Sequence, residues 1–107
     1  EKALKKWSIF SGGDKYEEAS EAFSKAGNAF KLAKEWEKAG EAYERAALAD
    51  LKAKAEYEAA GHYADAGHCL KNADVAKAVE KLTEAEAMYE DLGKLSQAAK
   101  LEKEMGE

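Results

Sequence analysis

Four residues in one short stretch carry side chains that can bind a metal ion. They are His62, Asp65, His68 and Cys69, and imidazole, carboxylate and thiolate groups are the usual ligands of zinc in proteins. On a helix, His62, Asp65 and Cys69 would share a face, whereas His68 would point elsewhere. A zinc site needs four converging ligands, or three and a water molecule. The spacing therefore favours a structural role, and we predict neither a bound metal nor another cofactor.

The acidic side chains do not indicate catalysis. Pairs such as Glu17 with Glu18, and Glu102 with Glu104, are typical of solvated helix faces, and no base or nucleophile accompanies them. The sequence therefore predicts a protein that is not an enzyme.

A group of large apolar side chains near the N-terminus has the composition of a membrane-binding loop. Trp7, Ile9 and Phe10 lie between two lysines and a Gly-Gly pair, and such a segment can insert shallowly into an anionic bilayer surface. Burying each large side chain would contribute about 1.5–3 kcal/mol. The alternative is that these side chains fold back and pack at the start of the first long helix.

A repeated spacing predicts the elements that hold these residues. An aromatic or aliphatic residue is followed three positions later by Ala, and such pairs begin roughly every twenty residues, so that two units make a hairpin of roughly forty. The pairs are Tyr16/Ala19, Trp36/Ala39, Tyr57/Ala60, Val75/Ala78 and Leu95/Ala98. We predict an all-α fold of antiparallel helical-hairpin repeats, a TPR-like α-solenoid or twisted helical sheet.

Capping residues and glycines set the expected boundaries. We expect Asp14 to cap the first long helix after a Gly-Gly loop, so that 1–13 form a basic segment with an apolar loop and 14–107 form the repeat domain. Asp74 is expected to cap the fourth helix, and Gly93 is expected to end it. The predicted helices cover 15–33, 36–52, 55–72, 75–92 and the residues from 95 onward.

Glycines inside the predicted helices indicate close helix packing. A glycine costs about 1 kcal/mol relative to alanine in a helix, so Gly27, Gly40, Gly61 and Gly67 suggest sites where a neighbouring helix approaches closely. The last helix has an apolar stripe without a following partner, so we expect this chain to be the N-terminal portion of a longer array, with possible self-association through that stripe.

The composition narrows the class of partner. The net charge of -5 argues against nucleic acid. The single cysteine, Cys69, fits a reducing compartment, and no apolar run approaches the roughly twenty residues that span a bilayer.

Several short segments, in this order and spacing, resemble those of a known family. They are Phe30-Lys31-Leu32-Ala33-Lys34-Glu35-Trp36, Ala39-Gly40-Glu41-Ala42-Tyr43, Asp65-Ala66-Gly67 and Asp91-Leu92-Gly93-Lys94. Together they resemble the soluble NSF attachment proteins, particularly the α type. The resemblance extends upstream, where the apolar loop and the first repeat are similar to the family's N-terminal loop and first repeat.

The resemblance implies an adaptor that wraps assembled SNARE bundles and recruits the ATPase NSF, which unwinds the bundle after membrane fusion. It implies a cytoplasmic, peripheral membrane protein. The family's basic contacts with the acidic SNARE surface correspond to Lys34, Lys71, Lys94 and Lys100, and its membrane loop corresponds to Trp7, Ile9 and Phe10. Family members are much longer, and the helices and acidic tail that meet NSF lie outside the matched region, so NSF contact is expected only of a full-length protein.

Two alternatives accompany this interpretation. Lysines near helix C-termini can simply complement the helix dipole and keep the surface soluble. The whole chain could also be a natural or designed helical-repeat scaffold with no SNARE role, which self-associates through its uncovered end.

Overall fold

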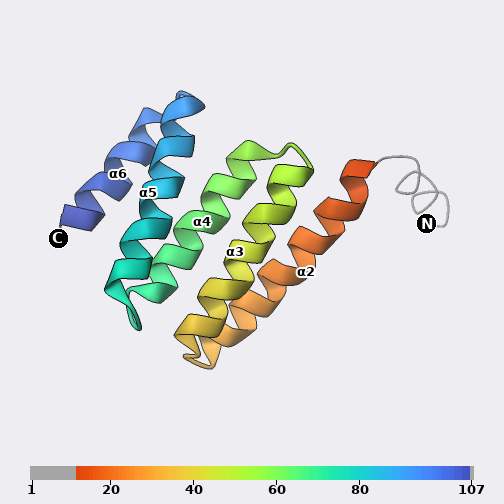
Figure 1. The fold of residues 1–107 in the computed structure, drawn as a ribbon, viewed down its shortest axis with the longest axis horizontal. Helices are drawn as coiled ribbons and strands as arrows, with labels where there is room; N and C mark the ends of the chain where they lie inside the picture. The colour runs from red at the N-terminus through yellow and green to blue at the C-terminus, as the bar shows by residue number, and fades with distance from the viewer. Residues whose placement is uncertain (1–11, 107) are drawn as a thin grey trace.

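The protein is a sheet of antiparallel helices. The computed structural model describes residues 12–106, and within that range every regular element is an α-helix. The helices are α2 (Gly12–Leu32), α3 (Trp36–Lys52), α4 (Glu56–Leu70), α5 (Val75–Asp91) and α6 (Leu95–Gly106) (Figure 1).

From α2 to α6, each helix packs against the next one along the chain. The Cα atoms occupy a slab of 48 × 34 × 16 Å, so the array is long and thin. The corners α2–α3 and α4–α5 lie along one edge, and α3–α4 and α5–α6 lie along the other (Figure 1). The prediction of an all-α fold of antiparallel helical-hairpin repeats is confirmed.

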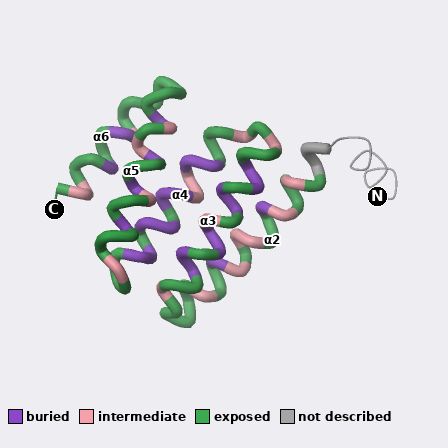
Figure 2. Tube along the Cα trace, in the orientation of Figure 1, coloured by how far each residue is buried: buried purple, intermediate pink, exposed green. Residues whose placement is uncertain are grey.

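The core consists mainly of alanines. The buried positions lie where neighbouring helices face each other (Figure 2). In the repeated pairs, Ala39, Ala60 and Ala78 are completely buried, whereas the large partners Tyr57 and Val75 are exposed. The small member of each of these pairs therefore makes the helix contact. Among the larger side chains, Tyr43 and Leu82 are the most deeply buried, and Tyr63, Leu70, Tyr89 and Leu101 are buried as well.

Three glycines allow large side chains to enter the neighbouring helix surface. A Cβ atom at Gly27 would lie 2.9 Å from the Tyr43 ring, one at Gly40 would lie 2.7 Å from Leu70 Cγ, and one at Gly67 would lie 2.5 Å from Leu82 Cγ. At distances this short, a Cβ atom would force the neighbouring side chain to move, so glycine is favoured at these positions. The predicted close approach is confirmed at these three sites. Gly61 differs, because the nearest atom to its Cβ position is Tyr89 Oη at 3.7 Å.

Three of the four corners share one backbone design. Lys34, Lys54 and Gly93 have φ values of 61°, 60° and 77°, in the left-handed region. The residue that follows each of them donates its N–H to the carbonyl five positions back; Glu35 N, for example, lies 2.8 Å from Phe30 O. This is the Schellman arrangement, which satisfies carbonyls at the helix end. The prediction that Gly93 ends its helix is confirmed, whereas the left-handed lysines were not predicted.

The fourth corner, between α4 and α5, uses a side-chain cap. Asp74 Oδ1 accepts a hydrogen bond of 3.2 Å from the N–H of Lys77, as predicted.

At the other end of the array, the prediction of a loop at Gly12 and Gly13 is wrong, because both glycines belong to the first turn of α2. Asp14 lies inside the helix rather than at its cap. The N–H groups of a first helical turn have no partners within the helix, and glycine can adopt the helical conformation, so it is tolerated there.

The glycine contacts predict opposite effects for two alanine substitutions in α4. Gly67→Ala should lower the free energy of unfolding by about 1–3 kcal/mol, because the new methyl group overlaps Leu82. Gly61→Ala should raise it by about 0.5–1 kcal/mol, because alanine favours the helix and meets only an ordinary contact. Urea unfolding followed by circular dichroism measures both values, and equal shifts for the two variants would contradict the packing described here.

Candidate partner-binding surface

The four lysines singled out in the sequence lie at helix corners or on the last helix. Lys34 lies in the α2–α3 corner and Lys71 follows the end of α4, so both lie along the same edge. Lys94 lies in the α5–α6 corner on the opposite edge, and Lys100 lies within α6 (Figure 1). All four residues are exposed. They therefore do not form one compact patch but are distributed over both edges and the C-terminal end of the sheet.

Lys94 contacts an aromatic side chain of α4. Its Nζ lies 5.4 Å from the centre of the Tyr57 ring, within the range of a cation–π interaction. The Tyr57 hydroxyl also accepts a hydrogen bond of 3.3 Å from Gln97 Nε2 of α6. The same ring packs edge-on against Tyr89, with centroids 5.8 Å apart. Lys94 is thus held at the edge where α4, α5 and α6 meet.

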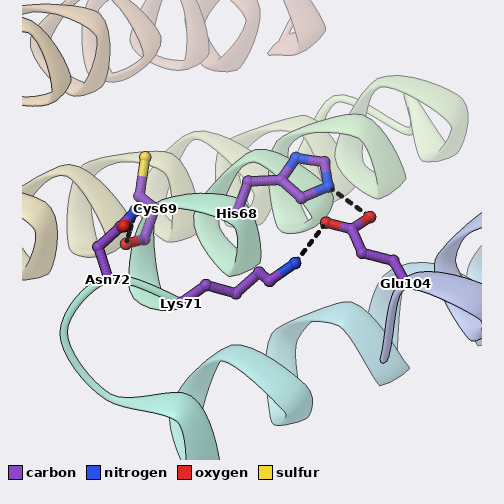
Figure 3. Close-up of polar contacts among 5 residues, drawn as sticks. All are labelled: His68, Cys69, Lys71, Asn72 and Glu104. Carbon is purple, nitrogen blue, oxygen red and sulfur yellow. Dashed lines mark hydrogen bonds and ion pairs between the residues drawn. The ribbon is translucent and has the colours of Figure 1, made fainter. Parts of the chain in front are cut away.

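Lys71 forms part of a three-residue polar cluster that joins α4 to α6. Lys71 Nζ lies 3.2 Å from Glu104 Oε2, and His68 Nε2 lies 3.0 Å from Glu104 Oε1. Figure 3 shows both side chains reaching from α4 and its C-terminal end to the single carboxylate on α6. Although partial burial opposes the effect, the hydrogen bonds from His68 and Lys71 lower the pKa of Glu104.

A groove between α4 and α6 is lined by His68 and Glu104 of this cluster, and Lys71 lies beside it. It has a volume of about 310 Å³, and Tyr89 of α5 and Leu101 of α6 contribute to its lining. The charged residues along it are Asp65, His68, Lys100 and Glu104. Desolvation in the groove raises the pKa of Asp65, against the opposing positive charges of His62, His68 and Lys31. The groove thus combines an apolar wall with charges of both signs.

A second groove lies between α3 and α5, with Leu70 of α4 in its lining. Here Lys81 Nζ lies 3.0 Å from Glu44 Oε2, and the ammonium group is only 14% exposed. Burial disfavours the charged lysine, but the hydrogen bond to Glu44 and the negative charges of Glu44, Glu84 and Glu80 together outweigh it and raise the pKa of Lys81. Because one groove joins α3 to α5 and the other joins α4 to α6, alternate helices lie towards opposite faces of the sheet.

The four residues first considered as metal ligands have separate structural partners. His62 Nδ1 lies 2.6 Å from Asp50 Oδ2 of α3, and the Asp50 side chain is buried. His68 pairs with Glu104, Asp65 lines the α4–α6 groove, and the Cys69 thiol is buried in the core. Within the described part of the chain, no three His, Cys, Asp or Glu side chains form a group that could hold a metal ion.

The proposed membrane-contacting residues Trp7, Ile9 and Phe10 lie outside the described residues. None of the helices within 12–106 has the length and apolar character needed to cross a bilayer.

The expected uncovered stripe on the last helix is mostly covered, because Ala98 and Leu101 are buried and Met105 packs against the core. Leu95 is 65% exposed, and self-association through this stripe stays a prediction.

Sequence reasoning missed the roles of His68 and Glu104. Glu104 was interpreted as ordinary surface charge, although it follows Lys100 by one helical turn and so shares its face. That spacing was the only available signal. The contact itself joins α4 to α6 across the intervening α5, and the stacking of three helices had to be known before it could be found.

Comparisons with known proteins give a consistent match. The family model described as "Soluble NSF attachment protein, SNAP" matches residues 1–107. An alpha-soluble NSF attachment protein of Vitis vinifera is 39% identical over 107 residues, which is 100% of this chain and 36% of the relative. The human protein of the same name is 40% identical over 92 residues, covering 86% of this chain and 31% of the relative.

A fungal relative extends the match. A probable vesicular-fusion protein sec17 homolog of Schizosaccharomyces pombe is 33% identical over 101 residues, which is 94% of this chain and 35% of the relative. The chain therefore spans about a third of the length of these curated relatives.

The Glu104 cluster predicts a pH-dependent contribution to stability. Because folding lowers the pKa of Glu104 below its ordinary value of 4.5, the ionised carboxylate stabilises the fold above that pH, and this contribution is lost as the pH falls through the folded-state pKa. Glu104→Gln should therefore destabilise the protein by about 0.2–1 kcal/mol at pH 7. Urea unfolding of both proteins at pH 7 and pH 3 measures the difference, which should shrink at pH 3; a difference that grows with acidification would contradict the assignment.

Proposed function

This chain belongs to the soluble NSF attachment protein family, and from that premise we propose that it is an adaptor that binds assembled SNARE bundles during vesicle fusion. The observation that carries the proposal is the family match over residues 1–107. The names of the relatives describe attachment to NSF and vesicular fusion, so we infer binding rather than enzymatic activity. Recruitment of NSF is proposed only for a full-length protein.

The positions of the basic residues support this proposal. Lys34 and Lys71 lie along one edge and Lys94 along the other, about the width of the sheet apart, and Lys100 extends the series onto α6. A rod-shaped acidic partner lying across the helices would meet such spaced charges one after another. Spaced charges contribute orientation and association rate more than affinity, which suits a partner that must be released after disassembly.

We also propose a weak, peripheral membrane contact through Trp7, Ile9 and Phe10. These residues precede α2, whose first residue is Gly12, so the contact would lie at the N-terminal end of the helical sheet. A short apolar segment beside lysines favours reversible attachment to an anionic surface. Membrane and SNARE contacts from one chain would act together, because each raises the local concentration for the other.

Charge reversal tests the SNARE contact. Replacing Lys34, Lys71, Lys94 and Lys100 with Glu should weaken binding to an assembled SNARE bundle by at least about tenfold, because four favourable charge contacts become repulsive. The loss should be largest at low salt and smaller at 0.5 M salt, where surface charges are screened. Fluorescence anisotropy with a labelled bundle measures both affinities.

A matched variant separates this surface from net charge. Lys25, Lys54, Lys77 and Lys103 are also exposed, and reversing these four gives the same change in net charge. This control should lose clearly less affinity than the test variant. Equal losses would show that the partner responds to overall charge, and an unchanged affinity of the test variant would refute the proposed contact residues.

The membrane contact is tested by removing its largest apolar groups. Ile9→Ser with Phe10→Ser should reduce co-flotation with anionic liposomes several-fold, because each lost side chain removes about 1.5–3 kcal/mol of potential burial. Val75→Ser, which alters an exposed apolar residue at the start of α5, is the control and should leave flotation unchanged. Undiminished flotation of the double variant would mean that the loop does not contact the bilayer.

A further inference from the structure

We propose that the α4–α6 groove binds an acidic side chain of the partner. In the free protein, Glu104 pairs with the same cationic groups and therefore competes with the partner for them. This inference rests on the proposed function, because it concerns how two of the proposed contact residues, Lys71 and Lys100, meet an acidic helical bundle. It assigns Glu104 a regulatory role that follows neither from the family match nor from the positions of the lysines.

The geometry around Glu104 is that of a bound carboxylate. Its two oxygens are engaged separately, Oε1 by His68 Nε2 at 3.0 Å and Oε2 by Lys71 Nζ at 3.2 Å (Figure 3). The donors come from α4 and its C-terminal end, and the acceptor comes from α6, two helices further along the chain. Charge-assisted bonds to both oxygens of a carboxylate are the arrangement that an incoming Asp or Glu would need.

The surroundings have room for a second acidic side chain. The groove holds about 310 Å³, and Ala64 and Leu101 give it an apolar wall against which a methylene stem can pack. Lys100 lines the same groove one helical turn before Glu104. Among the described residues, no ion pair involves Lys100, so its charge remains available to a partner.

Charge balance explains why Glu104 would oppose binding. The carboxylates facing the groove are Asp65 and Glu104, and the cations are Lys100 in the groove and Lys71 beside it, with His68 as a titratable group. The local charge is close to zero when His68 is neutral, so the groove attracts an acidic partner weakly. A partner carboxylate can pair with His68 and Lys71 only if Glu104 moves away from them. Glu104 lies in the last turn of α6, and its side chain is already 26% exposed, so it can swing further into solvent.

The test compares two neutralised glutamates on the same helix. Glu104→Gln removes the competing charge, whereas Glu102→Gln removes the same charge from an exposed position outside the groove. Binding of each variant to an assembled SNARE bundle is measured by fluorescence anisotropy at 50 mM and 300 mM salt. We expect Glu104→Gln to bind about three- to tenfold more tightly at low salt and Glu102→Gln to change by less than about twofold.

A double-mutant cycle identifies the cation that Glu104 blocks. In a Lys71→Gln background, the gain from Glu104→Gln should fall to about twofold or less, because the cation it would release is absent. A full gain in that background would overturn the proposed competition and indicate a general charge effect. Circular dichroism verifies that each variant is folded.

The outcomes separate this inference from the proposed function. If wild type binds the bundle and Glu104→Gln binds equally or more weakly, the competitor role is wrong and the adaptor role stands. If neither wild type nor Glu104→Gln binds at either salt concentration, the adaptor role proposed for this chain is wrong as well.

Discussion

The close approach of helices at Gly27, Gly40 and Gly67 is the constraint on which the rest of the structure depends. At each site a Tyr or Leu side chain occupies the space that a Cβ atom would need. Because alanines fill most of the remaining contact surface, the helices pack through small residues and the sheet stays thin. The resulting spacing fixes where each corner lies, and the corners carry most of the basic residues that a partner would meet.

A thin helical sheet also explains how its charges are organised. Alternate helices lie towards opposite faces, so side chains two helices apart can meet across a groove: Glu44 with Lys81 on one face, and Glu104 with His68 and Lys71 on the other. Such bridges join elements that do not otherwise pack closely.

The corners show where local sequence rules succeed and where they fail. Gly93 and Asp74 were identified because their residue types are strongly preferred at helix ends. Lys34 and Lys54 adopt the same left-handed conformation as Gly93, yet lysine carries no such preference, so only the register of the flanking helices imposes it. The reverse error occurred at Gly12 and Gly13, where a residue type typical of loops begins a helix.

By itself, the sequence determined that the chain is helical and where most helices begin and end, because these properties depend on residues three or four positions apart. It also indicated glycines as sites of close helix contact, but the tertiary structure decided that Gly27, Gly40 and Gly67 make such contacts and Gly61 does not, because the side chains that fill the space belong to the next helix. The sequence also carried the family resemblance, which resides in the order of short segments. The tertiary structure alone decided which members of the repeated pairs are buried, that His62 and His68 have different acidic partners, and that Glu104 engages Lys71. Those outcomes join residues 12 to 36 positions apart, and such pairs meet only after helix stacking has set the distance between alternate helices.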